Sequence, residues 1–207
     1  MAAVVTTNCP NLELIARGKV RDLYRVDDHS LLFVATDRIS AFDVIMENGV
    51  HNKGKLLTEI SKFWFSYLKD VVPNHLITGN FEEMPDKVKQ YRDQLEGRSM
   101  LVKRLRVLPV ESIVRGYITG SAWSEYKKKG TVCDIPLPVG MQESQAFAEP
   151  LWTPSTKAEI GDHDENIHPS KARDYALERG IIIADTKFEF GVDEHDNLYL
   201  IDEVLTP

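Results

Sequence analysis

The chain has 207 residues, with 25 lysines and arginines against 32 aspartates and glutamates, which gives a net charge of -7. This acidic balance argues against a protein that binds nucleic acid or an anionic membrane through its overall charge. Hydrophobic residues make up 43% of the chain, as in a globular protein, and no apolar run reaches the roughly 20 residues that span a bilayer. The two cysteines lie far apart and the N-terminus lacks the pattern of a secretory signal, so we expect reduced thiols and a cytoplasmic location.

A hairpin is predicted near the N-terminus. Residues 20–26 alternate between apolar and polar, residues 27–30 are typical of a turn, and residues 31–35 form an apolar run. Gly18 and Lys19 lie at the entrance of this hairpin, where backbone N–H groups and one ammonium could contact phosphate oxygens. The glycine spacing of a P-loop is absent, so a solvated turn is the alternative.

The apolar run at 31–35 continues directly into Asp37 and Arg38. Ligands often bind where polar residues follow a buried strand, so both residues are candidates for substrate binding. The alternative is an Asp–Arg pair that fixes the loop. A helix with one buried face is predicted after residues 52–55 from apolar residues at helical spacing, namely Leu56, Leu57, Ile60, Phe63, Trp64 and Leu68. A second, charged helix is predicted over 85–95.

Two apolar-rich segments, 99–104 and 108–114, are predicted as strands at the passage between two lobes. Arg115 follows the second of them, and Ser121 is a candidate N-cap for a helix that ends near Gly130. A helix N-terminus with a serine hydroxyl and a nearby arginine is a candidate anion site. Plain helix capping is the alternative. The long polar loop 153–166 also has the character of a functional loop.

The last segment is predicted as two strands, 181–191 and 198–204. Asp185, Lys187 and Glu189 share one face of the first strand, and the residues between them point towards a core. Asp202 and Glu203 end the second strand, and a hairpin brings that end back towards the charged face of the first. Carboxylates beside a lysine at a strand end are typical of a site for a hard cation and a phosphate-bearing ligand. An edge hairpin with solvated charges is the alternative.

Several long motifs, in order along the chain, resemble the SAICAR synthetase family of de novo purine biosynthesis. They are G-K-V-R-D-L-Y, A-T-D-R-I-S-A-F-D, V-R-G-Y-I-T-G-S-A-W, T-P-S-T-K-A-E-I-G-D-H-D-E-N-I, and A-D-T-K-F-E-F-G followed by L-I-D-E-V-L-T-P. The resemblance implies a two-lobed α+β / α/β fold, with an antiparallel N-terminal lobe over 1–103 and a mixed-sheet C-terminal lobe over 104–207. ATP is then expected in the cleft between the lobes, as in kinase and ATP-grasp nucleotide clamps.

The activity that the resemblance implies is ATP-dependent ligation. ATP phosphorylates the carboxylate of carboxyaminoimidazole ribonucleotide (CAIR), and the amine of L-aspartate displaces phosphate from the acyl phosphate. The expected cofactors are ATP and Mg²⁺, the expected partners are small molecules only, and we expect a monomer.

The resemblance also assigns roles to residues at the matching positions. The expected catalytic residues are Lys157, Asp185 and Lys187. ATP is expected to contact Lys19, Met100, Val102, Lys103, Glu111 and Lys157. The expected substrate-binding residues are Asp37, Arg38, Arg115, Ser121, His163, Asp164, Asp185 and Lys187. Glu189 and Asp202 are expected to bind the metal.

Two departures from the family pattern bear on these expectations. Family members continue past L-T-P with an Asp-Ser-Ser-Arg segment, and they carry a longer helical stretch between the D-E-N-I loop and residue 181. The C-terminal lobe is therefore expected to be incomplete. If the chain is truly shortened, the alternatives to a ligase are a small-molecule kinase or a catalytically silent nucleotide-binding protein.

Overall fold

The computed structural model describes residues 2–41, 44–156 and 185–206. The chain divides into two compact units, one formed by residues 1–106 together with 191–207 and the other by residues 107–190. The first unit therefore takes up the end of the chain as well as its beginning. The expected lobe boundary between residues 103 and 104 stays a prediction.

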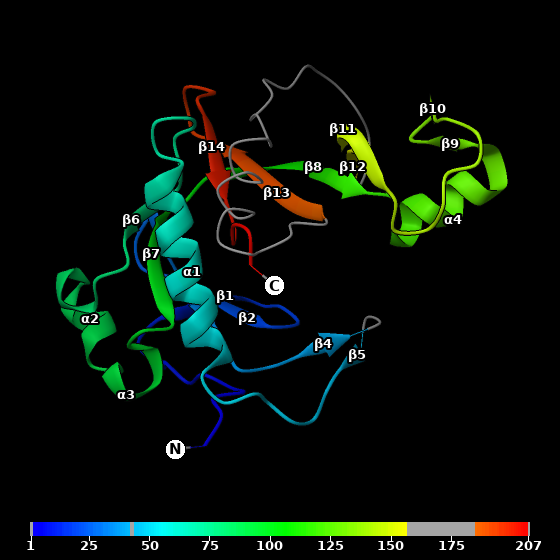
Figure 1. The fold of residues 1–207 in the computed structure, drawn as a ribbon. Helices are drawn as coiled ribbons and strands as arrows, with labels where there is room; N and C mark the ends of the chain where they lie inside the picture. The colour runs from blue at the N-terminus through cyan, green and yellow to red at the C-terminus, as the bar shows by residue number, and fades with distance from the viewer. Residues whose placement is uncertain (1, 42–43, 157–184, 207) are drawn as a thin grey trace. The chain divides into compact units, whose positions relative to one another are not determined.

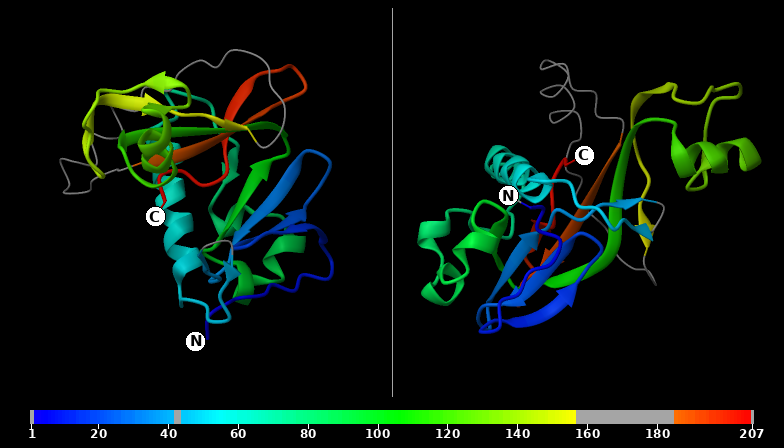
Figure 2. Two further views of the ribbon diagram at one scale, coloured as in Figure 1. Left: turned by 90° about the vertical axis from the view of Figure 1, so that its right-hand side faces the viewer. Right: turned by 90° about the horizontal axis from the view of Figure 1, so that it is seen from below.

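The first unit is built on a five-stranded antiparallel sheet (Figures 1 and 2). Its strands, in spatial order, are β1 (Glu13–Arg17), β2 (Arg21–Arg25), β3 (Ser30–Ala35), β7 (Ser99–Lys103) and β6 (Leu76–Thr78). The β2–β3 hairpin agrees with the prediction for residues 20–35. A separate short hairpin joins β4 (Ser40–Ala41) to β5 (Val44–Ile45).

Alternate residues of a strand point to opposite faces of the sheet, so the apolar residues on each face need partners. Helices supply these partners. Leu32 and Val34 of β3 join a buried cluster with Val88 and Leu95, from the short helices α2 (Asp86–Lys89) and α3 (Arg92–Leu95). The remaining helices of this unit are the 3₁₀ turn η1 (Phe81–Glu83) and α1 (Lys53–Tyr67), and α1 packs against β3 and β7.

Two details of the helices differ from the predictions. Leu57 and Trp64 of α1 are buried as predicted, but Leu56 and Phe63 are 60% and 46% exposed. The buried face of α1 also includes Phe65, which was not predicted, with small residues between the large ones. The single helix expected over 85–95 is two separate helical turns, α2 and α3. Neither helix is long enough to show the 3.6-residue periodicity from which a single helix is inferred.

The second sheet has the order β11–β8–β13–β14, with β12 also paired to β8. Its strands are β8 (Arg106–Tyr117), β11 (Ala146–Trp152), β12 (Ser155–Thr156), β13 (Asp185–Val192) and β14 (Leu198–Ile201). Helix α4 (Gly120–Lys129) follows β8 and leads into a short hairpin of β9 (Thr131–Val132) and β10 (Ile135–Pro136). Gly130 ends α4 in the left-handed conformation, as a C-terminal glycine commonly does.

Together these elements confirm the α+β class expected from the sequence. In the second sheet, the pairings of β8 with β11 and with β12 are antiparallel. The mixed character expected for that sheet stays a prediction. Among the helices of the described residues, none is both long and apolar enough to cross a bilayer.

A buried ion pair fixes the end of β3. The Asp37 carboxylate accepts hydrogen bonds from the Arg98 guanidinium at 2.7 Å and from the backbone N–H groups of Val4 and Gly54. Asp37 is fully buried and Arg98 is 3% exposed. Burial by itself raises the pKa of Asp37, but the hydrogen bonds outweigh it and lower the pKa below the usual 3.8. The pair thus joins the N-terminal segment, the start of α1 and the start of β7.

Replacing Asp37 with asparagine leaves a buried guanidinium without its counter-charge. We expect the free energy of unfolding near neutral pH to fall by about 3 to 5 kcal/mol. Because the pKa of Asp37 is lowered in the folded state, the stabilisation is complete above about pH 3.8 and is lost as the pH falls further. Urea denaturation over a pH series measures this, and the curves of wild type and Asp37→Asn should converge in acid.

Asp28→Asn is the matched control, because Asp28 is 81% exposed in its ion pair with Arg25. That variant should lie within about 0.5 kcal/mol of wild type at neutral pH. A loss at Asp37 no larger than the control's, or a gap that stays constant into acid, would contradict the role of the pair.

Candidate functional site

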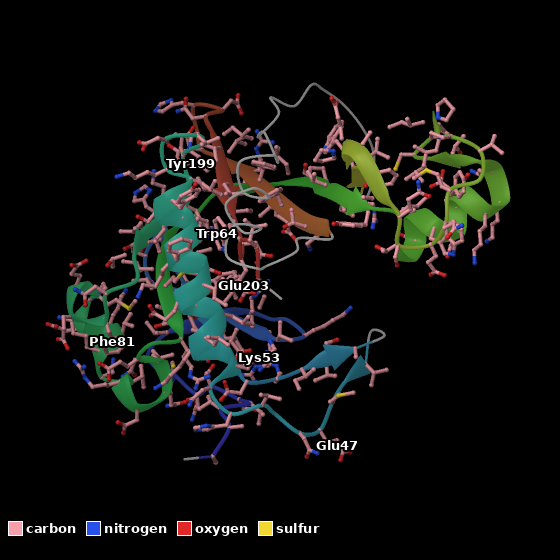
Figure 3. All side chains as sticks on the ribbon, in the orientation of Figure 1. Glu47, Lys53, Trp64, Phe81, Tyr199 and Glu203 are labelled. Carbon is pink, nitrogen blue, oxygen red and sulfur yellow. The ribbon has the colours of Figure 1, made fainter. Side chains whose placement is uncertain are left out.

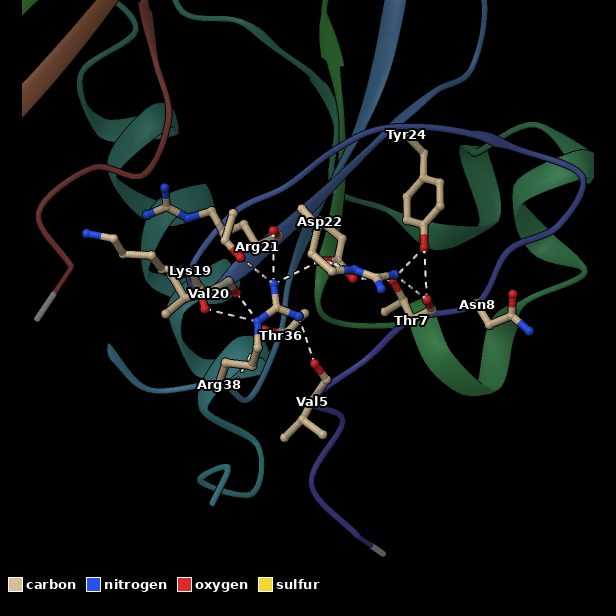
Figure 4. Close-up of polar contacts among 12 residues, drawn as sticks. Val5, Thr7, Asn8, Lys19, Val20, Arg21, Asp22, Tyr24, Thr36 and Arg38 are labelled. Carbon is tan, nitrogen blue, oxygen red and sulfur yellow. Dashed lines mark hydrogen bonds and ion pairs between the residues drawn. The ribbon is translucent and has the colours of Figure 1, made fainter. Parts of the chain in front are cut away.

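Lys19 lies in the turn between β1 and β2, as expected from the sequence. The turn is closed by a hydrogen bond from the Gly18 N–H to the Arg21 carbonyl oxygen at 2.8 Å. Both Gly18 and Lys19 are exposed. Figure 4 shows the Arg38 guanidinium donating hydrogen bonds to carbonyl oxygens of this turn. The turn therefore presents an accessible ammonium on a fixed backbone.

Arg21 connects this turn to the segment that follows β14. Its guanidinium pairs with the carboxylates of Asp202 at 2.5 Å and Glu203 at 2.8 Å. Burial acts to lower the pKa of Arg21, but the two carboxylates outweigh burial and raise it above its ordinary value. A permanently charged arginine thus holds two carboxylates, one of them the expected metal ligand Asp202, beside the turn that carries Lys19.

A second cation, Lys53, lies at the first residue of α1 and close enough to Glu203 for their charges to interact (Figure 3). Burial lowers the pKa of Lys53, and the nearby Arg21 adds to this effect, while Glu203 opposes it. The segment after β14 therefore holds two carboxylates, Asp202 and Glu203, beside two cations, Arg21 and Lys53. Such a mixed-charge cluster at strand ends is suited to phosphate oxygens and a divalent cation.

The backbone of Asp202 is itself fixed. Asp202 adopts a φ of 67°, which is uncommon for a residue with a side chain. The buried His75 side chain makes a hydrogen bond with the Asp202 backbone. Burial lowers the pKa of His75 to about 3, although this hydrogen bond acts in the opposite direction. His75 is therefore neutral near pH 7.

Other residues expected near ATP lie in β7. Met100 and Val102 are buried, and the Lys103 ammonium lies over the Tyr199 ring, 4.2 Å from its centre. β7 is paired with β3 on one side and with β6 on the other. The backbone hydrogen-bonding groups of β7 are therefore largely taken up by the neighbouring strands. Contact between β7 and a nucleotide stays a prediction.

Asp37 and Arg38 are both buried and both paired, but not with each other. Asp37 pairs with Arg98, and Arg38 pairs with Asp22 at 2.8 Å. The alternative of a pair between Asp37 and Arg38 is therefore wrong, because each residue is fixed by a partner from elsewhere in the chain. A direct contact between substrate and either residue stays a prediction.

Arg115 and Ser121 lie together in the second unit, as the candidate anion site requires. The Arg115 guanidinium donates hydrogen bonds to Ser121 Oγ and to Thr153 Oγ1, each at 3.1 Å. Arg115 is 7% exposed, whereas Ser121 is exposed. One expectation is corrected: the N-cap of α4 is Thr119, so Ser121 lies in the first turn of the helix. Its hydroxyl accepts from Arg115.

Lys187 and Glu189 share a face of β13, as predicted from their alternation. Their ammonium and carboxylate are 2.7 Å apart, and Phe188 and Phe190 between and beyond them are buried. Lys157, His163 and Asp164 lie outside the described residues. For Glu111 and Asp185 the structure describes the backbone, in β8 and β13, and their side chains lie outside what is described.

Two residues of the charged cluster, Arg21 and Lys53, were given no role by the predictions from sequence, whereas Glu203 was expected beside Asp202 at the end of the last strand. Arg21 lies within the G-K-V-R motif, so proximity to an assigned residue was the available signal for it. The pairing of Arg21 with Asp202 joins positions 181 residues apart, and no local pattern encodes such a contact.

Comparison with known proteins gives a consistent result. The family model described as SAICAR synthetase matches residues 14–176 and 169–207. Phosphoribosylaminoimidazole-succinocarboxamide synthase of Pichia angusta is 57% identical over 225 residues, covering 95% of this chain and 74% of the relative. The Saccharomyces cerevisiae protein of the same name is 55% identical, with 95% and 74% covered.

Solved structures agree. A SAICAR synthase superimposes with a TM-score of 0.87 at 50% identity, covering 99% of this chain and 77% of that one. The Saccharomyces cerevisiae SAICAR synthase complexed with SAICAR gives a TM-score of 0.86 at 50% identity, covering 98% and 77%.

Fold and homologues together define an ATP-dependent ligase of the α+β class. The chain belongs to the SAICAR synthetase family. The function predicted from the motifs, ATP-dependent ligation in purine biosynthesis, is confirmed, and the alternatives of a small-molecule kinase or a silent nucleotide-binding protein are not favoured.

Replacing Arg21 with methionine leaves Asp202 and Glu203 without their shared cation. We expect the free energy of unfolding to fall by about 2 kcal/mol, less than for a fully buried pair because the Arg21 side chain is 28% exposed. Urea denaturation measures the loss, and Arg21→Lys should recover part of it. In the control Arg106→Met, which breaks an exposed pair with Asp196, the change should be within about 0.5 kcal/mol. Equal effects of the two variants would contradict a structural role for the Arg21 cluster.

Proposed function

We propose that the chain joins L-aspartate to the carboxylate of CAIR at the expense of ATP, giving SAICAR, ADP and phosphate. Family membership along the chain supports this reaction, and the observation that carries it is the relative complexed with SAICAR, which is 50% identical over 98% of this chain.

The reaction solves a problem of carbonyl chemistry. A carboxylate is a poor electrophile, because its negative charge repels a nucleophile and oxide is not a viable leaving group. In the first step a CAIR carboxylate oxygen bonds to the γ-phosphorus of ATP, and the bond to ADP breaks. In the second step the neutral aspartate amine bonds to the acyl carbon, phosphate leaves with that oxygen, and the nitrogen loses one proton and keeps the other as the amide N–H. Charge must be offset at the phosphates in both steps.

We assign the residues that bind ATP and the ribonucleotide phosphate as follows. Lys19, exposed on its fixed turn, contacts ATP phosphates together with Lys157. Met100, Val102, Lys103 and Glu111 line the nucleotide. The buried Arg115 and the Ser121 hydroxyl that accepts from it bind the ribonucleotide phosphate together with Lys187. The helix N-terminus at Ser121 adds favourable electrostatics for an anion.

The remaining assigned residues act around the reacting groups. Asp185 and Lys187 flank the ribonucleotide, and Asp37 and Arg38 belong to the substrate side. His163 and Asp164 are assigned to L-aspartate. The surroundings of Asp37 and Arg38 favour an indirect contribution, because both side chains are buried in ion pairs. Location in the cytoplasm, a monomeric state and partners restricted to small molecules complete the proposal.

Glu189 and Asp202 are proposed as the ligands of Mg²⁺. Their donor chemistry fits, because Mg²⁺ prefers carboxylate oxygens. Both carboxylates are partly accessible, with side-chain exposures of 17% and 15%, and each lies against a cation, Lys187 or Arg21. Among the described residues no group of three or more His, Cys, Asp or Glu is arranged around a common point. When bound, Mg²⁺ offsets charge on the phosphates.

The ligase reaction is tested by measuring phosphate release from ATP with CAIR, with and without L-aspartate. We expect phosphate and SAICAR in equal amounts only when both substrates are present, because the acyl phosphate is consumed by the amine. Steady phosphate release that does not respond to aspartate would indicate a kinase. ATP binding without release would indicate a silent nucleotide-binding protein.

The metal assignment is tested with Glu189→Gln, which keeps the size of the side chain and removes its charge. We expect kcat to fall by about 100-fold or more, because a charge-stabilising group is lost from the transition state. Glu194→Gln is the control, since Glu194 is exposed in the turn between β13 and β14 and should leave kcat unchanged. Circular dichroism verifies that both variants are folded. Full activity of Glu189→Gln would remove Glu189 from the metal site.

A further inference from the structure

The turn between β1 and β2 has an unusual arrangement of its carbonyl groups. Four consecutive carbonyl oxygens, those of residues 18–21, accept hydrogen bonds from side chains or backbone behind the turn. Arg38 Nη2 donates to the Gly18 and Arg21 oxygens at 2.9 and 3.0 Å, and Arg38 Nε donates to the Lys19 oxygen at 3.0 Å. Thr36 covers the fourth, with its hydroxyl 2.6 Å from the Val20 oxygen. Figure 4 shows the contacts with the Gly18, Lys19 and Arg21 oxygens converging on the Arg38 guanidinium.

Arg38 is fixed in this position by its own surroundings. It is 8% exposed and pairs with Asp22, which is fully buried. Arg38 Nη1 also donates to the Val5 oxygen at 2.7 Å, which anchors the N-terminal segment to the same group. Asp22 in turn accepts a hydrogen bond from Thr7 Oγ1 at 2.6 Å. With five acceptors around it, this guanidinium is committed to the protein rather than directed to a ligand.

The orientation of carbonyl groups decides whether a turn can accept an anion. A carbonyl oxygen carries partial negative charge, so a turn whose oxygens face a phosphate repels it. Holding these oxygens on the inner side removes that repulsion in advance and fixes the backbone of Lys19 before the ligand arrives. Preorganisation of this kind improves affinity because the ordering cost is already met in the free protein.

We propose that Arg38 is a positioning residue for ATP phosphate binding: it holds the Gly18–Arg21 turn by its carbonyl oxygens and so orients Lys19, without touching the ligand itself. The inference rests on the proposed phosphate contact of Lys19. It replaces the expected contact between Arg38 and substrate with an indirect role.

The role depends on the shape of the guanidinium. Its donors spread in a planar fork that reaches the Gly18, Lys19 and Arg21 oxygens at once. A lysine ammonium is a single point with three donors and does not span the same acceptors. Arg38→Lys therefore keeps the buried positive charge beside Asp22 and removes the fork, which separates the geometry of Arg38 from its charge.

The experiment measures ADP binding by titration calorimetry in the absence of Mg²⁺, so that the metal assignment does not enter. We expect Arg38→Lys to weaken ADP binding about 10-fold, and Lys19→Met to weaken it by a similar factor. In the Lys19→Met background the further loss from Arg38→Lys should shrink to about 2-fold, because residues that act through one another are not additive. In steady state, the KM for ATP should rise more than kcat falls.

Hydrogen exchange gives a readout independent of ligand. We expect faster exchange of the backbone amides in the Gly18–Arg21 turn in Arg38→Lys, with exchange in β7 unchanged. Val88→Ala is the matched control, because it removes buried methyl groups from the cluster beneath α2 and α3 and destabilises the protein without touching the turn. It should leave both ADP affinity and exchange in the turn unchanged.

A double variant guards against misfolding. If Arg38→Lys fails to fold, Arg38→Met combined with Asp22→Asn removes both buried charges together and should show the same weakening of ADP binding. Weaker binding after Lys19→Met but unchanged binding and exchange after Arg38→Lys would overturn the role of Arg38 and leave the proposed function standing. Unchanged ADP binding after Lys19→Met would overturn the phosphate contact and the positioning role together.

Discussion

The guanidinium of Arg38 is the interaction on which the first unit depends. It is held by Asp22 and binds backbone oxygens from the N-terminal segment and from the β1–β2 turn. A buried charge is costly unless it is paired and fully hydrogen-bonded, so the chain segments around it have little freedom to move apart. The second buried pair, Asp37 with Arg98, works in the same way at the end of β3. Two ion pairs thus set the shape of a turn and of a helix start.

The charges around the segment after β14 have a different character. Arg21 is 28% exposed and Lys53 is partly buried. The carboxylates beside them are Asp202, with its side chain 15% exposed, and Glu203, with its side chain 7% exposed. Groups of this kind are stable in the folded protein and still within reach of a ligand. The family's chemistry moves negative charge between ATP, an acyl phosphate and free phosphate, and this requires cations that are fixed in place. Buried pairs provide the scaffold, and the partly exposed cluster is the part that we propose contacts the phosphates.

Sequence patterns predicted the local features well. The alternation in β2 and β13, the separation of Lys187 and Glu189 from Phe188, and the left-handed glycine at the end of α4 all follow from short-range rules. The same rules failed where burial depends on distant elements. Leu56 and Phe63 fit the helical spacing but lie on the exposed side of α1, because the sheet covers only one face of the helix.

The amino-acid sequence by itself determined the family, the reaction class and most strands and helices, because these are encoded in motifs and in periodicities of a few residues. Tertiary structure alone decided the partners of the charged residues. Asp37 is followed directly by an arginine but pairs with Arg98, 61 residues away, and Arg21 finds Asp202 across 181 residues. The physical reason is that an ion pair is selected by burial and by the geometry of its hydrogen bonds, which exist only after distant strands have been brought together.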